Sequence, residues 1–325
     1  MATNTTMSTS THIELTPPDI RRWAAGTHGI GYAHTFDSGL PGPHVMVNAV
    51  THGNEICGAI TVDRLLGLAA QGMRPLKGKL TLSFANIAAY DKWDPADPHA
   101  NRFVDEDFNR VWTPEVLDGP RHSVELARAR ELRPLVEQVD LLFDIHSMHN
   151  PHGAVMICGL LDKGIAFAKQ VGIPEHIVSD AGHANGTRMR DFGGFGDPKS
   201  PKNALLVECG QHWERAAAEV SWQSTWRFLR VAGIMDAALC ESHIDRVPVP
   251  QQKVIRVTEA VIAKTKDFTF IDGLGGLSVV PKAGDLIAVD HGEQVLAPYD
   301  NCVLIMPTLI HVKPGLTAVR LGRLI

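Results

Sequence analysis

The feature that most constrains the fold is a series of apolar, β-branched segments that alternate with helix-like segments between residues 44 and 240. Near-continuous apolar runs of this kind are typical of strands that are covered on both faces. The alternation predicts an α/β protein with a mixed central sheet flanked by helices. In such a protein, ligands bind beyond the carboxyl ends of the strands.

The predicted strands cover residues 44–50, 79–86, 139–146, 154–158 and 203–209. The predicted helices cover residues 55–71, 122–138, 161–171 and 213–240. Two long segments, 87–120 and 180–202, lack regular patterning. Long irregular loops are uncommon inside a compact domain and often carry function.

The pattern changes near residue 245, where the Pro-rich segment "DRVPVPQQ" precedes short strand-like runs. We therefore expect a flexible polar tail over 1–12, a catalytic α/β domain over 13–245 and a smaller β-rich domain over 246–325. The tail has no Lys or Arg before Arg21 and no apolar run, which argues against a secretory signal or a transit peptide.

Charge and cysteine content narrow the partners and the compartment. The net charge is −5 and no basic block is present, which argues against a nucleic-acid partner. No apolar run approaches the ~20 residues that a membrane-spanning helix needs. The five cysteines are scattered without a CxxC pair, which favours a reducing cytoplasm. A homo-oligomer is compatible with a chain of this size.

The first predicted strand runs into the sequence "THGNE", which places His52 and Glu55 at the rim of the sheet. An imidazole and a carboxylate at this spacing can converge on one ion, and Gly53 permits a turn that a Cβ would obstruct. A second interpretation is purely structural. In it, Glu55 caps the following helix, whose dipole favours an acid there, and His52 hydrogen-bonds locally.

A second predicted strand, "LLFDIH", ends in Asp144 and His146. If the two strands are neighbours, His146 meets His52 and Glu55. Two His and one Glu with an open fourth position form the ligand set of a catalytic zinc. Asp144 either orients this site from behind or is an ordinary strand-end acid. Two histidines in the turn that follows compete for the role of third ligand: His149 and His152.

A third strand, "NALLVECGQ", carries Glu208 after an apolar run. A carboxylate is costly to bury there unless it is paired or functional. Glu208 is therefore either the partner of an arginine from the 180–202 loop or a general base that acts on water beside a metal.

The loop segment "NRFVDEDFNR" contains Arg102, Asn109 and Arg110. A planar guanidinium binds a carboxylate through two hydrogen bonds, and an amide can support it. The alternative is a solvated charged loop without a ligand.

Taken in order, these segments resemble the aspartoacylase and succinylglutamate desuccinylase family, relatives of the zinc carboxypeptidases. The resembling motifs are "HGNE" (52–55), "RFVDEDFNR" (102–110), "DIHS" (144–147) and "VECG" (207–210). The resemblance implies a zinc-carboxypeptidase-like sheet with a β-rich C-terminal domain. It also implies one Zn²⁺ per chain, held by His52, Glu55 and His146.

The same resemblance implies roles for four further residues. Glu208 matches the general base, and Arg102 matches the arginine that polarises the carbonyl group. Asn109 and Arg110 match the pair that binds the carboxylate of the substrate.

The chain departs from aspartoacylases proper before and after these motifs, with "VNAVT" before "HGNE" and "CGQH" after Glu208. A further substrate arginine has no direct equivalent, and Arg188 and Arg190 are its possible stand-ins. Tyr299 is the candidate for a tyrosine donated by the C-terminal domain.

The sequence therefore predicts a zinc-dependent amidohydrolase that cleaves a small, carboxylate-bearing N-acyl amino acid or a related acyl amide. A carboxypeptidase-like hydrolase of short peptides is the second interpretation. A binding protein that has lost catalysis is the third.

Overall fold

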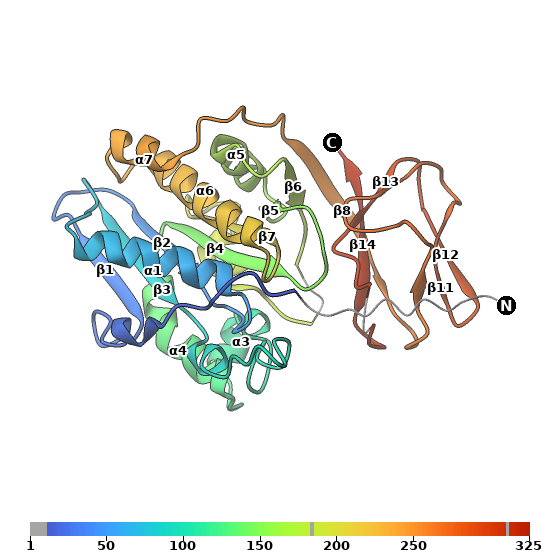
Figure 1. The fold of residues 1–325 in the computed structure, drawn as a ribbon, viewed down its shortest axis with the longest axis horizontal. Coiled ribbons are helices and arrows are strands. Elements are labelled where there is room, and N and C mark those ends of the chain that lie inside the picture. Colours follow the sequence, from blue (N-terminus) through green and yellow to red (C-terminus); the bar gives the residue numbers. More distant parts are fainter. Residues whose placement is uncertain (1–11, 183–184, 310–311) are drawn as a thin grey trace.

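The computed structural model describes residues 12–182, 185–309 and 312–325. The predicted tail over 1–12 lies outside these residues except for His12. A large α/β part and a smaller C-terminal β region lie side by side (Figure 1), and the predicted fold class is confirmed. Within the described ranges, no helix has both the length and the apolar character needed to cross a bilayer.

The α/β part is built on a mostly parallel sheet. Its strands are β1 (Ala33–Asp37), β2 (His44–Ala49), β3 (Lys79–Phe84), β4 (Leu141–Met148), β5 (Val155–Ile157), β6 (His176–Ser179) and β7 (Asn203–Gln211). β3, β2, β4 and β7 are parallel neighbours in that order. The carboxyl ends of β2, β4 and β7, which follow one another in the sheet, therefore meet at one edge.

Helices cover both faces of this sheet. They are α1 (Ile56–Ala70), α2 (Ile87–Tyr90), α3 (Pro114–Leu117), α4 (Val124–Val136), α5 (Asp162–Val171), α6 (Arg215–Ala232) and α7 (Ala237–His243). Val45 and Val47 of β2 pack in the same cluster as residues of α1 and α6, whereas Met46 packs with residues of α4. Because alternate residues of a strand face opposite sides, two covering layers require the continuous apolar runs seen in the sequence.

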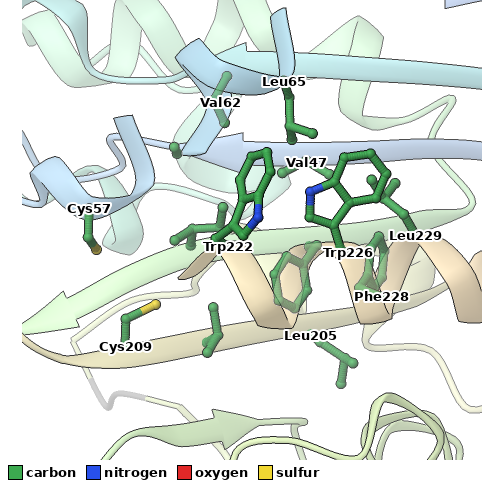
Figure 2. Packing of buried hydrophobic residues seen from close by; sticks show 14 of the residues in the cluster. Val47, Cys57, Val62, Leu65, Leu205, Cys209, Trp222, Trp226, Phe228 and Leu229 are labelled. Carbon is green, nitrogen blue, oxygen red and sulfur yellow. The ribbon is translucent and has the colours of Figure 1, made fainter. Parts of the chain in front are cut away.

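Large aromatic rings fill the layer between α1, α6 and the sheet (Figure 2). Trp226 and Phe228 of α6 are fully buried, and the Phe228 ring stacks on Phe143 of β4 with 4.7 Å between centroids. Burial of one such side chain contributes roughly 1.5–3 kcal/mol. This layer holds β4 and its neighbours as a rigid platform for the strand ends.

The helix predicted over 213–240 is wrong in one respect, because the structure contains two helices there. α6 ends at Gly233, which has φ +66°, and Asp236 caps the start of α7 through a hydrogen bond from Leu239 N. A left-handed glycine at this position is a common helix terminator.

The C-terminal β region continues the central sheet. Its strands are β8 (Lys253–Ile262), β9 (Thr269–Phe270), β10 (Val279–Val280), β11 (Leu286–Asp290), β12 (Glu293–Leu296), β13 (Cys302–Ile305) and β14 (Thr317–Leu324). β8 pairs in parallel with β6 and antiparallel with β14. Among the described residues the strand order is β1-β3-β2-β4-β7-β5-β6-β8-β14-β13-β10, and β12, β11 and β9 form a second sheet.

Candidate metal centre and substrate pocket

Three side chains from two adjacent strand ends converge at the carboxyl edge of the sheet. His52 lies in the turn after β2, Glu55 is the residue before α1, and His146 lies near the end of β4. One potential ligand atom from each residue lies within 4.8 Å of the other two, and all three residues are buried. The pairing of β2 with β4 brings these distant parts of the sequence together.

A close approach of two chain segments makes the turn between His52 and Glu55 dependent on glycine. A Cβ at Gly53 would lie 2.4 Å from the carbonyl oxygen of Asn101 and 2.5 Å from the carbonyl carbon of Ala89. Contacts this short do not occur between real Cβ atoms and backbone. The loop that begins at residue 87 is therefore packed directly on the turn.

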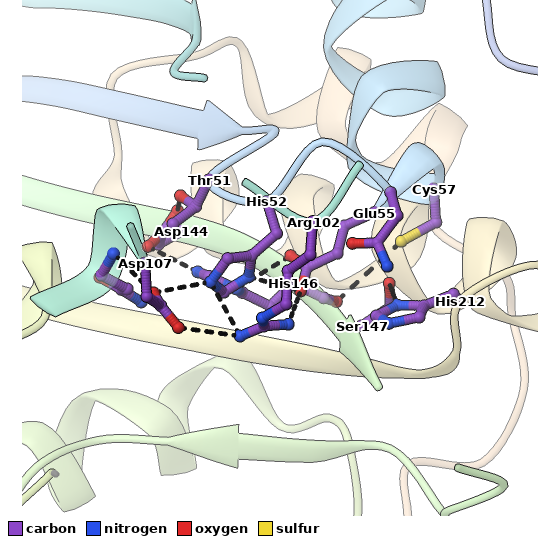
Figure 3. Close-up of polar contacts among 12 residues, drawn as sticks. Thr51, His52, Glu55, Cys57, Arg102, Asp107, Asp144, His146, Ser147 and His212 are labelled. Atoms are coloured by element: carbon purple, nitrogen blue, oxygen red, sulfur yellow. Dashed lines mark hydrogen bonds and ion pairs between the residues drawn. The ribbon is translucent and has the colours of Figure 1, made fainter. Parts of the chain in front are cut away.

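The two oxygens of Glu55 face the two histidines (Figure 3). Nδ1 of His52 lies 2.7 Å from Oε1, and Nδ1 of His146 lies 2.9 Å from Oε2. Glu55 forms no side-chain cap on α1. Two imidazole nitrogens and a carboxylate oxygen match the donor set of a catalytic zinc site, so these residues fit the metal.

Each histidine is held from behind by a second carboxylate. Nε2 of His146 lies 2.8 Å from Oδ2 of Asp144, and Nε2 of His52 lies 3.0 Å from Oδ1 of Asp107. When Nε2 carries the proton and donates it to the carboxylate, the lone pair of Nδ1 faces Glu55. This arrangement orients an imidazole for metal binding.

Asp144 is itself fixed in place. Its Oδ1 accepts hydrogen bonds from Nδ2 of Asn48 at 2.8 Å and from Oγ1 of Thr51 at 3.0 Å. The sequence singled out Asp144 but not Asp107, although Asp107 lies inside the quoted motif "RFVDEDFNR". Three acids occur in that motif, and nothing in the local pattern distinguishes the one that reaches His52.

Charge within the site holds the carboxylate and imidazole of the cluster in their ionised forms. Burial alone would raise the pKa of Glu55, but His52 and His146 outweigh it and hold that pKa well below its usual value. Burial would lower the pKa of His146, but Asp144 and Glu55 outweigh it and raise that pKa well above its usual value. A metal that binds here therefore competes with a proton.

Glu208 lies beside this cluster because β7 pairs with β4. In the strand register Glu208 is the direct partner of His146. Its Oε2 is buried and has no hydrogen-bond partner within the described residues. Burial raises the pKa of Glu208 to about 8, Glu55 adds to the rise, and His146 and Arg102 oppose it. A carboxyl group with a pKa near neutrality can both accept and donate a proton.

Arg102 extends over the cluster from the 87–120 loop. Its Nη2 lies 2.9 Å from Nε2 of His52 and donates to Oδ2 of Asp107 at 3.2 Å, and its Nη1 lies 3.8 Å from Oε1 of Glu55. About 37% of the Arg102 side chain remains exposed. The guanidinium is therefore held beside the cluster and still faces the pocket.

The cluster opens into a cavity of about 220 Å³. Besides the three potential ligands, its walls include Arg102, Asn109, Arg110, Arg188 and Glu208 from the α/β part, and Met306, Pro307, Thr308 and Arg320 from the C-terminal β region. Arg320 was not predicted. Arg320 lies in β14, and the sequence of that strand does not show that this side chain faces the cavity.

Positive charge accumulates on one wall of the cavity. Burial lowers the pKa of Arg110 to about 10, Asp107 opposes the change, and the charges of Arg102, Arg320 and Arg188 add to it. Mutual repulsion among these guanidinium groups would be relieved by an anion in the cavity. Oδ1 of Asn109, beside Arg110, accepts a hydrogen bond from Met189 N at 2.8 Å, which fixes its amide.

The two candidate arginines of the 180–202 loop face different cavities. Arg188 lines the cavity described above and donates to Asp180 at 2.7 Å and to Asp191 at 2.6 Å. Arg190 lines a second cavity and donates to the carbonyl groups of Cys158 and Ala204. Only Arg188 is therefore in a position to meet a ligand beside the metal cluster.

Tyr299 also lies away from the residues that line the main cavity. Its hydroxyl group is 2.7 Å from Oγ1 of Thr258, and the guanidinium of Arg323 lies 4.0 Å from the centroid of its ring. The side chain thus packs within the C-terminal β region, and among the described residues it is not part of the cavity lining.

The competing histidines line the cavity without joining the cluster. Nε2 of His152 accepts a hydrogen bond from Met306 N at 3.2 Å, so its lone pair is in use. The His149 ring packs on His99 with 3.9 Å between centroids. Among the described residues, the group that could hold a metal consists of His52, Glu55 and His146.

Fold and site together define an α/β protein with a group of two histidines and one glutamate at the edge of its sheet that could hold a metal ion. The chain belongs to the family described as the succinylglutamate desuccinylase/aspartoacylase catalytic domain, whose model matches residues 41–218. A succinylglutamate desuccinylase of Pseudoalteromonas atlantica is 24% identical over an alignment of 298 positions that covers 81% of this chain and 76% of that protein.

Solved structures show the same fold. The succinylglutamate desuccinylase from Chromobacterium violaceum has a TM-score of 0.61 at 20% identity, over 91% of this chain and 89% of that one. A putative succinylglutamate desuccinylase/aspartoacylase from Shewanella frigidimarina has a TM-score of 0.64 at 15% identity, over 90% of this chain and 93% of that one. The resemblance stated from the sequence motifs is confirmed.

Proposed function

We propose that this chain is a zinc-dependent amidohydrolase that cleaves the amide bond of a small N-acyl amino acid or a related acyl amide. The observation that carries the proposal is the position of Glu208, a half-buried residue whose buried Oε2 has no hydrogen-bond partner within the described residues, directly beside His146. Membership of a family whose named relatives are deacylases supports the same reaction class.

In the proposed reaction, separate residues hold the metal, transfer the proton and stabilise the developing charge. His52, Glu55 and His146 would hold the zinc ion, which when bound would supply a Lewis acid able to lower the pKa of water to about 7. Glu208 takes a proton from the attacking water and later delivers it to the leaving nitrogen. Arg102 donates hydrogen bonds to the carbonyl oxygen as negative charge develops there.

The positive wall of the cavity binds the carboxylate of the substrate. Asn109 and Arg110 hold this group, and Arg188 adds positive charge close by. A fixed carboxylate sets the position of the amide bond relative to Glu208, which is the orientation effect that makes the attack efficient. Arg190 and Tyr299 have no role in this proposal.

The size of the cavity favours a small substrate over a peptide. Its volume of about 220 Å³ lies below the ~300 Å³ at which pockets for drug-sized ligands begin. The segment 306–308 of the C-terminal β region forms part of its wall.

The five cysteines are buried free thiols, which supports the proposal that the protein works in a reducing compartment such as the cytoplasm.

The test begins with the metal content of the purified protein beside that of a His52→Ala variant. About one zinc per chain, lost in the variant, is the expected result. The wild type is then assayed with a panel of N-acyl amino acids and, in parallel, with dipeptides. Absence of metal after incubation with zinc would overturn the mechanism. If dipeptides were cleaved faster than N-acyl amino acids, the protein would instead be a hydrolase of short peptides.

A further inference from the structure

The segment from Arg102 to Asp107, here called the arginine loop, carries two groups that touch the metal cluster. Arg102 and Asp107 both contact His52. The loop forms only turns and bends between Asn101 and the 3₁₀ helix Phe108–Arg110. Without regular secondary structure, the backbone of the loop does not by itself explain why both side chains are held against the cluster.

Two contacts fix the ends of the arginine loop on the site. The carbonyl oxygen of Arg102 accepts a hydrogen bond from Gly53 N at 3.1 Å. At the other end, Oδ1 of Asp107 lies 3.0 Å from Nε2 of His52 and accepts a hydrogen bond from Asn109 N at 2.9 Å. The middle of the loop, residues 103–106, has to be held by something else.

That element is Glu125, a fully buried carboxylate in the first turn of α4. Its Oε1 accepts hydrogen bonds from Val104 N at 2.6 Å and from Asn86 Nδ2 at 3.0 Å. Its Oε2 accepts from Asp105 N at 3.0 Å and from Glu106 N at 3.2 Å. Three consecutive backbone N–H groups of the loop thus converge on one side chain.

The chemistry of these contacts requires a carboxylate. Both oxygens of Glu125 are acceptors, and each receives two donors. An amide in the same place would turn an NH₂ group toward N–H donors on one side, which leaves buried donors unpaired. The negative charge is met by backbone N–H groups and by the positive end of α4, a strong arrangement for a buried anion.

We propose that Glu125 is a positioning residue of the active site, which sets the arginine loop so that Arg102 and Asp107 reach His52 together. The predicted effect of Glu125 on catalysis rests on the proposed function. Its predicted effect on the position of the loop rests on the hydrogen bonds described above. Glu125 itself touches neither the cluster nor the cavity lining, so its effect passes through the loop.

The structural part is tested by amide hydrogen exchange on the metal-free protein. In Glu125→Gln, the amides of Val104, Asp105 and Glu106 are expected to lose protection. Thr61→Val is the matched control, since it breaks a buried hydrogen bond of 2.7 Å to Ser221 between α1 and α6. The control should leave these three amides protected. Unchanged exchange in Glu125→Gln would overturn the proposal whether or not the enzyme is active.

The catalytic part is tested by a double-mutant cycle with Arg102→Ala. In the wild-type background, Glu125→Gln is expected to lower kcat about 10- to 100-fold, as for other residues that orient ligands from behind. In the Arg102→Ala background, the same change should lower kcat by a smaller factor, because one of the two groups that Glu125 positions is gone and only Asp107 remains. Equal losses in both backgrounds would show a general structural effect and overturn the proposal.

Glu125→Asp provides a second variant in case Glu125→Gln does not fold. It keeps both acceptors but is shorter by one methylene group, so an intermediate loss of protection and of kcat is expected. A wild type that is inactive on the whole substrate panel would refute the proposed function instead, while the exchange experiment would still decide the role of Glu125.

Discussion

Two carboxylates that do not face the cavity centre decide what the two histidines can do. Asp144 and Asp107 lie on the Nε2 sides of His146 and His52, and both Nδ1 atoms face Glu55. With the opposite tautomer, Nδ1 would carry the proton and could not bind a metal. Asp144 favours the proton on Nε2 of His146. At His52, Asp107 favours a proton on Nε2, whereas the positive charge of Arg102 at 2.9 Å opposes it.

Replacement of Asp107 tests this selection. Asp107→Asn removes the charge that holds the proton on Nε2 of His52 and also releases Arg102. We expect the affinity for zinc to fall about 10- to 100-fold, measured by competition with a chelator. Asp118→Asn, which removes one charge from an exposed ion pair with Arg133, should leave the affinity unchanged. Equal affinities in wild type and Asp107→Asn would mean that the tautomer needs no such partner.

Replacement of Glu208 separates proton transfer from metal binding. Glu208→Gln keeps the shape of the side chain but removes the base, so kcat should fall by about 10²- to 10⁴-fold. The zinc content should stay at the wild-type level, because Glu208 is not a member of the His52–Glu55–His146 group. Turnover close to that of the wild type would assign the proton transfer to another group.

The sequence predicted the residues that follow buried strands and missed those whose position depends on long-range packing. His52, His146 and Glu208 each end an apolar run, and parallel neighbours bring such ends together. Asp107 and Arg320 carry no such mark, because one lies in a charged loop and the other in a strand of the C-terminal β region. Their roles depend on which segments meet in space, which local pattern does not encode.

At the scale of elements, continuous apolar runs were predicted as strands, and runs interrupted by polar residues were not. The segments that became β2, β4, β5 and β7 contain such apolar runs, and β5 was predicted although it has only three residues. β1 (AHTFD) and β6 (HIVS) were not predicted, because polar residues leave no continuous apolar run in them. The break between α6 and α7 was missed because a single glycine in a long helical pattern is only a weak signal that a helix ends.

The tight packing of the turn after β2 gives a prediction for that element. Gly53→Ala places a Cβ against the backbone of Asn101 and Ala89. The loop must move, so the free energy of unfolding should drop by about 1–3 kcal/mol, measured by urea denaturation. Zinc binding should weaken as well, since Gly53 N also holds Arg102 O.

Gly67→Ala, in the helix α1 that follows this turn, is the matched control. Apart from its chain neighbours and the backbone of α1, no atom of the described residues lies within 4 Å of a Cβ at Gly67. Alanine is favoured over glycine in a helix by about 0.5–1 kcal/mol, so this variant should be as stable as the wild type or more so. If both glycine variants behaved alike, close packing would not be the reason for Gly53.

At the scale of the whole molecule, the C-terminal β region is both an extension of the sheet and a wall of the cavity. Removal of residues 246–325 would leave β6 as an open edge, because its neighbour in the described sheet is β8. Unpaired edges promote aggregation. Removal would therefore expose an edge of the sheet and also take away one wall of the cavity.

One histidine makes the contact between the two parts sensitive to pH. His152 accepts a hydrogen bond from Met306 N through Nε2, which only the neutral imidazole can do. Burial lowers the pKa of His152, the carbonyl group of Gly153 opposes the change, and His176 adds a small repulsion. The folded state therefore binds a proton less readily than the unfolded state, whose pKa is about 6.5.

The sign of the effect follows from this difference. The contribution of His152 to stability is complete above about pH 6.5 and is lost as the pH falls from there toward the lowered pKa of the folded state. Urea unfolding at about pH 8 and about pH 5 should show a larger loss of stability in the wild type than in His152→Gln. Identical losses would place the acid sensitivity elsewhere.

Asp180 has a consequence for how this protein can be recombined with its relatives. The carboxylate lies 2.7 Å from Nη2 of Arg188 in the α/β part, and its other oxygen lies 3.6 Å from Nε of Arg320 in β14. One acid is thus shared by cavity residues from both parts of the molecule. In a chimaera, positions 180, 188 and 320 must be inherited as a set. A C-terminal region grafted from a protein without this arginine would remove one of the two cationic partners of the shared acid beside the cavity.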